Sequence, residues 1–223
     1  STFKMTPEEV RLHRSDRLKD SEIHDPDDAP VPSFIPDTPL FRERMALFYD
    51  CITQVDYQVG DVLDKLSEHN LTDSTIIVFW ADHGSGYPRA KTHVYDDGLA
   101  VPLIIRFPEE YQHLAPAPPG TVVDDLVMHM DLGPSTLRWA GISLPEHFQG
   151  RALLSSQGRE SREFVCSARD RLDNCTEMIR TIRDKKYRYI RNFFPHRPYA
   201  SFYPDGGFFA EPPGGGTHEH GFW

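Results

Sequence analysis

Apolar residues recur every three or four positions over a long stretch that begins near residue 38. The repeating positions are Phe41, Met45, Phe48, Ile52, Val55, Val59, Val62 and Leu66. Thr38 is a residue type that caps helix N-termini, and Pro39 suits the first helical position. The spacing therefore predicts a long amphipathic helix that packs one face against another element.

The segment before this helix has a different pattern. Residues 1–37 are polar and show no hydrophobic period. Four prolines, at Pro26, Pro30, Pro32 and Pro36, prevent a continuous helix. We interpret this segment as a surface lead-in that precedes the start of the fold.

Two short apolar runs follow the helix. Residues 75–80 read Thr-Ile-Ile-Val-Phe-Trp, which is typical of a strand buried on both faces of a mainly parallel sheet. Residues 101–107 predict a second strand, and residues 131–140, followed by Gly141, predict a short helix. This order of elements indicates an α/β fold in which helices flank the sheet.

Shorter segments follow after about residue 160. They are residues 163–168, 177–183 and 187–194, separated by the turn sequences Asp173-Asn174 and Asp184-Lys185-Lys186. This pattern predicts a small antiparallel sheet, and the glycine- and proline-rich tail from Pro204 to Trp223 predicts irregular structure. We therefore divide the chain into part of an α/β core, residues 1–160, and a small antiparallel subdomain with its tail, residues 161–223.

The charge of the chain excludes some classes of partner. Its 223 residues include 24 Lys and Arg against 34 Asp and Glu, a formal net charge of -10. No broad basic face for nucleic acid is expected, so an anionic substrate would have to be captured in a local pocket. The sequence has no apolar run of about 18 residues and no basic segment followed by an apolar one near residue 1, so we predict no membrane span and recognise no signal peptide in it.

The cysteines leave two alternatives open. Cys166 and Cys175 flank a polar stretch that could turn as a hairpin. In an exported protein they could form a disulfide, and two free thiols are the alternative.

Polar residues with metal-binding chemistry follow the first predicted strand. Asp82 and His83 stand where that strand ends, which is the place where open α/β sheets bind ligands. A neighbouring carboxylate and imidazole can offer an oxygen and a nitrogen to one cation, and the further ligands would come from elsewhere. The structural alternative is that Asp82 caps the turn that follows it.

The loop after this pair carries cationic side chains among glycines. Arg89, Lys91 and His93 lie within a few residues of Asp82 and His83. Lysine supplies a compact positive charge and arginine a bidentate fork, so either can hold a tetrahedral anion and stabilise charge that develops on it. The alternative is a solvated surface loop, and the nearby Asp82-His83 pair favours the anion site.

Longer motifs surround these residues in a definite order. They are Phe48-Tyr49-Asp50, Val55-Asp56, Val59-Gly60, Ile76-Ile77-Val78-Phe79, Asp82-His83-Gly84, Lys91, Tyr95, Val101-Pro102-Leu103-Ile104-Ile105, the block from Asp131-Leu132-Gly133 to Gln149-Gly150, and Arg169-Asp170-Arg171 through Lys186-Tyr187-Arg188. In this order and spacing the chain resembles the second half of a sulfatase of the alkaline-phosphatase-like superfamily. The resemblance implies part of that superfamily's α/β fold, a mainly parallel sheet flanked by helices, followed by a small C-terminal antiparallel sheet.

The resemblance implies a role for each matching side chain. Asp82 and His83 match the pair that binds a single divalent cation, usually Ca2+, and His83 would contact either the metal or the sulfate. Lys91 matches the basic residue that contacts the substrate sulfate, so Lys91 and His83 are the expected catalytic residues. Arg89 and His93 lie in the variable part of the loop, where the sugar would be selected. The loop is most similar to that of heparan-type and related polysaccharide sulfatases, which implies a sulfated sugar or glycan as substrate.

The family's nucleophile has no match in this sequence. A sulfatase needs a formylglycine made from the pattern Cys/Ser-x-Pro/Ala-x-Arg, and the closest segment, residues 166–170, has Asp170 where the arginine is required. We therefore expect a fragment that is inactive alone, whose partner is a missing N-terminal half that carries the formylglycine.

The resemblance also frames the alternatives. It implies a sulfuric ester hydrolase that is exported, whether periplasmic, extracellular or lysosomal. The alternatives are a phosphodiesterase or phosphonate hydrolase of the same superfamily, and a noncatalytic sulfatase-like protein that binds sulfated sugar.

Overall fold

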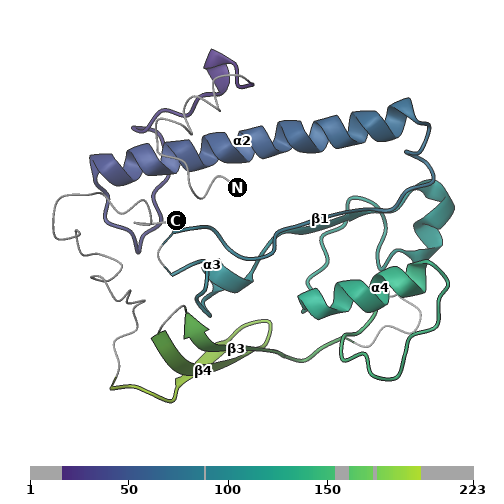
Figure 1. Cartoon of the computed structure of the whole chain (residues 1–223). Coiled ribbons are helices and arrows are strands. Elements are labelled where there is room, and N and C mark those ends of the chain that lie inside the picture. Colours follow the sequence, from purple (N-terminus) through teal and green to yellow (C-terminus); the bar gives the residue numbers. More distant parts are fainter. Residues whose placement is uncertain (1–16, 88, 154–160, 173–174, 197–223) are drawn as a thin grey trace. The chain divides into compact units, whose positions relative to one another are not determined.

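The computed structural model describes residues 17–87, 89–153, 161–172 and 175–196. They fall into two compact units that divide between Thr72 and Asp73 (Figure 1). The predicted boundary at residue 160 stays a prediction. In the described part of the chain, no helix combines the length and the apolarity that crossing a membrane requires.

The first unit is built on one long helix, α2, which runs from Pro39 to Glu68 (Figure 1). Thr38 caps it, because its hydroxyl accepts a hydrogen bond from the Phe41 N–H at 3.3 Å, and Pro39 occupies the first turn. The predicted helix is confirmed at its start and over its length. Its apolar face is buried around Met45 and becomes exposed toward Val62, which is 57% exposed.

The segment before α2 packs within the same unit. Three of its apolar side chains are buried: Leu18, Ala29 and Ile35. The Tyr49 hydroxyl donates to the Pro30 carbonyl at 3.3 Å, and the His24 backbone N–H donates to the fully buried Asp50 carboxylate at 2.9 Å. The prediction of a mere surface lead-in is therefore wrong for residues 17–37. Isolated apolar anchors and hydrogen bonds hold the segment, and such anchors leave no periodic pattern in the sequence.

A pair of strands forms the first part of the second unit. β1, Ile77–Trp80, pairs with β2, Leu103–Arg106, and Trp80 lies opposite Leu103. Both predicted strands form, but their pairing is antiparallel, and the described residues hold no parallel neighbour for either strand. The predicted burial of β1 on both faces is wrong, because none of its four residues is buried and Trp80 is exposed. Between the two strands, the described residues form only the short helix α3, Asp96–Leu99.

Three helical segments follow β2. They are the 3-10 helices η3, Glu109–Leu114, and η4, His129–Asp131, and the α-helix α4, Leu132–Trp139. α4 confirms the predicted helix, and Gly141 follows its end with a φ of 72°, a left-handed conformation that suits glycine. The Trp139 ring meets Phe107 edge to face at 5.2 Å, which packs α4 against the segment after β2.

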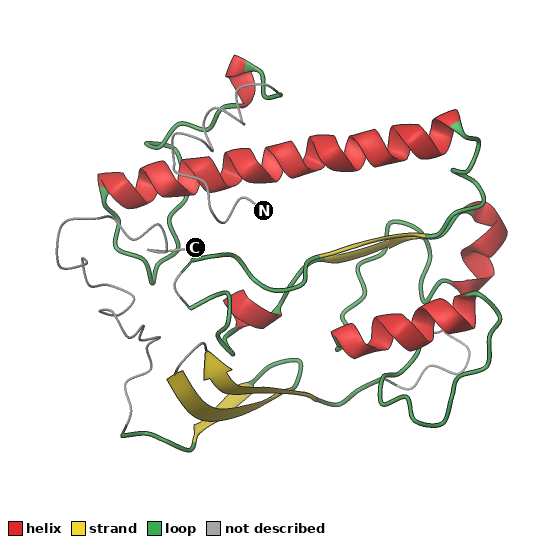
Figure 2. Cartoon of the chain, viewed as in Figure 1, coloured by secondary structure: helices red, strands yellow, loops and turns green. Residues whose placement is uncertain are grey.

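The predicted small antiparallel sheet is confirmed. Its strands are β3, Val165–Leu172, β4, Cys175–Arg183, and β5, Arg188–Asn192, in the order β3-β4-β5 (Figure 2). Asp184 forms the turn before β5, where its carboxylate accepts from the N–H groups of Lys186 and Tyr187 at 2.7 and 2.5 Å. The other predicted turn, Asp173-Asn174, lies outside the described residues.

The strand register separates the two cysteines. Cys166 lies opposite Ile182, whereas Cys175 lies opposite Leu172 near the other end of the hairpin. A disulfide needs Cα atoms within about 7 Å, which this register does not allow. Cys166 is a free, exposed thiol.

Candidate functional site

The second unit contains a pocket of about 1330 Å³, whose lining includes residues from each of the described strands and from α3, η3, η4 and α4. Asp82, His83 and His93 line it together with Trp80 of β1 and Ile104 of β2. The antiparallel sheet contributes four arginines to the same lining: Arg169, Arg171, Arg183 and Arg188. The pocket therefore combines an apolar wall with titratable and cationic side chains.

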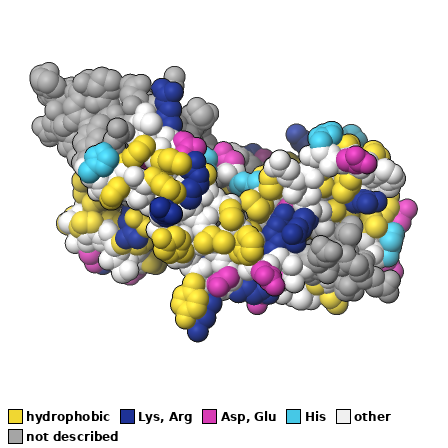
Figure 3. All heavy atoms as spheres, turned by 90° about the horizontal axis from the view of Figure 1, so that it is seen from below, with side chains coloured by type: hydrophobic (Ala, Val, Ile, Leu, Met, Phe, Trp, Pro, Cys, Tyr) yellow, Lys and Arg dark blue, Asp and Glu magenta, His cyan; other side chains and the backbone are white. Residues whose placement is uncertain are grey.

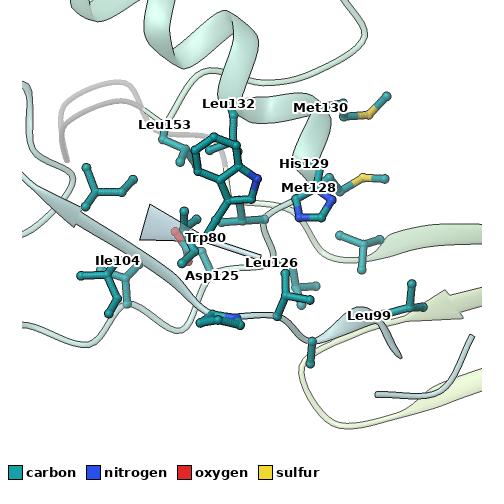
Figure 4. Close-up of a pocket in the computed structure, with 18 of the residues that line it drawn as sticks. Trp80, Leu99, Ile104, Asp125, Leu126, Met128, His129, Met130, Leu132 and Leu153 are labelled. Carbon is teal, nitrogen blue, oxygen red and sulfur yellow. The ribbon is translucent and has the colours of Figure 1, made fainter. Parts of the chain in front are cut away.

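The apolar wall comes from β1, β2 and the segment that enters α4. Figure 4 shows the Trp80 indole with the side chains of Leu132 and Leu153 drawn around it. Trp80 is 49% exposed and Ile104 is 63% exposed, so this wall is open to solvent in the chain. On the face drawn in Figure 3, hydrophobic side chains are interspersed with Lys and Arg.

The Asp82-His83 pair lies directly beyond the end of β1. The Asp82 side chain is 84% exposed, and its Oδ2 lies 3.4 Å from the His83 Nε2. The His83 Nδ1 lies 2.7 Å from the Gly84 carbonyl oxygen. When Nδ1 carries the proton and donates to that carbonyl, Nε2 presents its lone pair to the pocket beside the carboxylate oxygen. This is a donor set that fits a bound cation.

Gly84 makes this turn sterically feasible. A Cβ at this position would stand 1.8 Å from the Asp97 carbonyl oxygen, and the Gly84 N–H donates to the Gly98 carbonyl at 3.2 Å. Only glycine permits so close an approach between the two backbone segments. The Asp-His-Gly sequence thus sets the position of the pair through its glycine.

Asp82 and His83 do not complete a metal site by themselves. Within the described ranges, no group of three or more His, Cys, Asp or Glu side chains converges as metal ligands. Two side chains are fewer ligands than a divalent cation takes, so any further ligands would come from other groups.

Two residues of the following loop have left-handed backbone conformations. Arg89 has a φ of 70° and Thr92 a φ of 69°, and these positions flank Ala90 and Lys91. Non-glycine residues in this region cost about 1 kcal/mol or more each, so the surrounding structure must hold them in place. Buried Ala90 provides part of that hold, and the Lys91 N–H donates to the Ser85 carbonyl at 2.8 Å.

The aromatic ring of Tyr95 organises two predicted sugar-contacting residues. The Arg89 guanidinium lies 4.4 Å from the Tyr95 ring centroid, and the His93 ring stacks on Tyr95 at 6.3 Å with an interplanar angle of 11°. Burial lowers the pKa of His93, and the positive charges of Arg169 and Arg89 act in the same direction. Together they outweigh the hydrogen bond to the Lys91 carbonyl, so His93 is the neutral imidazole at neutral pH.

The structure brings part of the predicted set together. Asp82, His83 and His93 line the same pocket. Lys91 is half-buried and Arg89 exposed, and both belong to the same loop but lie outside the lining of the pocket. Their roles toward a ligand stay predictions.

Sequence reasoning missed residues that come from distant parts of the chain. The His129 Nε2 lies 3.0 Å from the carbonyl oxygen of Ala81, directly beside Asp82. Arg169 and Arg188 donate to loop carbonyls 77 and 94 positions away along the chain. No local pattern in the sequence marks such contacts. The one available signal was the high number of arginines in the predicted strands after residue 160.

Comparison with protein families gives two matches. Residues 4–142 match the sulfatase family, and residues 87–202 match the family described as N-sulphoglucosamine sulphohydrolase, C-terminal. Each match covers more than half of the chain.

Individual relatives are similar over part of their length. The chain is 37% identical over 169 residues to an ulvan-active sulfatase of Formosa agariphila, covering 76% of the chain and 27% of the relative. It is 33% identical over 142 residues to the N-sulphoglucosamine sulphohydrolase of Homo sapiens, covering 60% of the chain and 27% of the relative. The chain thus spans about a quarter of the length of these relatives.

Solved structures show the same fold. A phosphonate monoester hydrolase from Silicibacter pomeroyi matches with a TM-score of 0.60 and 27% identity over 73% of this chain and 36% of that one. A protein solved with its substrate D-glucosamine-2-N,6-O-disulfate matches with a TM-score of 0.59 and 20% identity over 84% of this chain and 43% of that one. The predicted alkaline-phosphatase-like fold class is confirmed as a partial fold.

Proposed function

The chain belongs to the sulfatase family, and we propose that it forms part of a sulfuric ester hydrolase that releases sulfate from a sulfated glycan. Family membership supports the reaction class. The relatives described as an ulvan-active sulfatase and an N-sulphoglucosamine sulphohydrolase support a sulfated glycan as substrate. The observation that carries the proposal is the position of Asp82 and His83. The Asp82 Oδ2 lies 3.4 Å from the His83 Nε2, and both residues line a pocket that also contains several arginines.

In this proposal Asp82 and His83 hold one divalent cation, which is calcium. The Asp82 carboxylate is the hard oxygen ligand that calcium prefers, and its exposure leaves both oxygens accessible. When bound, the cation would supply positive charge next to the sulfate oxygens. His83 orients its Nε2 through the contact of Nδ1 with the Gly84 carbonyl.

The loop supplies the remaining contacts to the substrate. Lys91 contacts the sulfate, as the family resemblance implies, and its backbone is held by the hydrogen bond to Ser85. Neutral His93 can both donate and accept hydrogen bonds, which suits sugar hydroxyl groups. Arg89 stays over Tyr95 and presents its guanidinium edge to a second anionic group of the sugar.

The nucleophile and the other metal ligands belong to a further part of the protein. The chain covers 27% of the ulvan-active sulfatase and 27% of the N-sulphoglucosamine sulphohydrolase, and it contains no Cys/Ser-x-Pro/Ala-x-Arg sequence. We assign the formylglycine to a preceding N-terminal half that completes the site. Export from the cell, or delivery to a lysosome, is part of the same proposal.

A second candidate is the hydrolysis of phosphonate or phosphate esters. The observation that favours it is the match to a phosphonate monoester hydrolase with 27% identity and a TM-score of 0.60. A tetrahedral phosphonate or phosphate would use the same cation and the same loop charges. The two candidates therefore differ in which substrate reacts faster.

The test uses the complete natural protein that contains this chain, purified from its source. Peptide mass spectrometry would identify the formylglycine, and ion chromatography would measure sulfate released from ulvan oligosaccharides and from N-sulfated glucosamine. We expect release that stops when the metal is chelated and returns when Ca2+, but not buffer alone, is added. A higher kcat/KM for a phosphonate monoester would establish the second candidate. Binding of sulfated sugar without any release would establish a noncatalytic protein.

A further inference from the structure

Arginines of the small antiparallel sheet donate hydrogen bonds to backbone carbonyls of the loop that contains Lys91 and His93. The Arg169 Nη1 on β3 donates to the Thr92 carbonyl at 3.0 Å, and the Arg188 Nη1 on β5 donates to the Val94 carbonyl at 2.9 Å. Arg188 also donates to the Asp96 carboxylate at 2.5 Å. These contacts join the sheet to the loop at three successive points.

Thr92 is the point at which such a hold matters most. It is a β-branched residue with a φ of 69°, a conformation that such residues rarely adopt. It stands between Lys91 and His93, so a change in its backbone would reorient both neighbours. The hydrogen bond from Arg169 reaches the carbonyl of this residue.

Arg169 is itself held in place by a buried partner. Its Nε lies 2.7 Å from the Glu177 Oε2, and the two side chains are 4% and 7% exposed. A register shift between Arg169 and Arg171 interrupts the pairing of β3 with β4, and such irregularities re-aim side chains. Buried ion pairs contribute little net stability compared with apolar packing, so stability alone does not account for this arrangement.

We propose that Arg169, held by Glu177, is a positioning residue that sets the Thr92 backbone and thereby the placement of Lys91 and His93 toward the substrate. This inference rests on the proposed function and deepens it. Arginine is required because its Nε engages Glu177 while its Nη1 reaches the Thr92 carbonyl. The single ammonium of a lysine cannot make both contacts from one position.

The test compares matched variants of the complete natural protein. Arg169→Lys keeps the charge and loses the double contact, and Glu177→Gln keeps the shape and removes the ion pair. The control is Arg180→Lys in the same sheet, whose pair with Asp170 is exposed. Sulfate-release kinetics, inhibition by free sulfate, and hydrogen exchange of residues 89–96 would be measured for each variant.

For both Arg169→Lys and Glu177→Gln we expect a loss of about tenfold or more in kcat/KM, because small displacements of binding groups are costly. Inhibition by sulfate should weaken, and exchange should rise more in residues 89–96 than in β5, whereas β4 also loses the buried partner that Glu177 supplies. Arg180→Lys should behave as the wild type. Unchanged loop exchange, or exchange that rises equally across the sheet, would overturn the inference. If the wild type releases no sulfate, the proposed function fails, and the exchange of the loop still tests the positioning role.

Discussion

Two aspartates of the second unit have opposite surroundings. Asp131 is fully buried, and its carboxylate accepts hydrogen bonds from the N–H groups of Met128 and Arg151 at 2.8 and 2.7 Å. The Arg162 guanidinium donates to both of its oxygens. Asp82, in contrast, is 84% exposed and has the His83 imidazole 3.4 Å away.

This difference separates a structural carboxylate from one that is available to a ligand. The protein itself satisfies the acceptor capacity of Asp131, so that carboxylate ties together the start of α4, residue 151 and residue 162. The Asp82 carboxylate is exposed, so its oxygens are accessible to a ligand. An exposed carboxylate that lines a pocket is a candidate for ligand binding, whereas a buried carboxylate with all its hydrogen bonds made within the protein stabilises the fold.

Replacing Asp131 tests the structural side of the comparison. Asp131→Ala removes both carboxylate oxygens from a buried site and leaves the Arg162 guanidinium, 10% exposed, without its carboxylate. Breaking a buried pair in this way costs about 3–5 kcal/mol. We expect this loss in the free energy of unfolding, measured by urea denaturation of the complete protein. The control, Asp170→Ala, breaks an exposed pair and should cost no more than about 1 kcal/mol. Equal losses in the two variants would contradict the structural role.

Replacing Asp82 tests the functional side. Asp82→Ala removes a proposed metal ligand, and we expect sulfate release to fall about 100-fold, because a preorganised charge next to the substrate is lost. The free energy of unfolding in metal-free buffer should change by less than about 0.5 kcal/mol, as for other exposed sites. Asp124→Ala, at another exposed aspartate, is the matched control. Full activity in Asp82→Ala would remove the basis of the proposed metal site.

Asp96 is an intermediate case, because its side chain is 55% exposed and contacts Arg183 and Arg188 at 3.1 and 2.5 Å. Burial alone would raise the pKa of Asp96, but the hydrogen bonds and charges of the two arginines outweigh it and lower the pKa. A lowered pKa contributes stability that is fully present above the unfolded-state pKa and is lost as the pH falls through the folded-state pKa. We expect a small effect, since exposed pairs are screened by solvent.

The measurement is the Tm of the wild type and of Asp96→Asn between neutral and strongly acidic pH. The difference between them should be largest at neutral pH and should shrink once the wild-type carboxylate is protonated. A difference that stays constant over the whole range would show that the ion pairs of Asp96 contribute nothing.

Much of the fold follows from local patterns in the sequence. Four local features each predict an element that the structure contains. They are the hydrophobic period of α2, its cap at Thr38, the apolar runs of β1 and β2, and the turn at Asp184. The segment before α2 was misinterpreted, because its few buried side chains are anchored without any period. The antiparallel pairing of β1 with β2 also escaped prediction, because an apolar run does not specify the direction of the neighbouring strand, and the run 77–80 is not buried as predicted.

By itself, the sequence determined most of the elements and the Asp82-His83 pair, since these depend on residues that are neighbours in the chain, and it determined the family, which depends on the order and spacing of motifs along the chain. Only the tertiary structure showed that Asp131 is buried whereas Asp82 is exposed, and only it joined Arg169 to Thr92. Burial and hydrogen bonding arise from residues far apart in the sequence: Arg162 lies 31 positions from Asp131, and Arg169 lies 77 positions from Thr92. The role of a charged side chain is set by the dielectric and the partners around it, and folding supplies both.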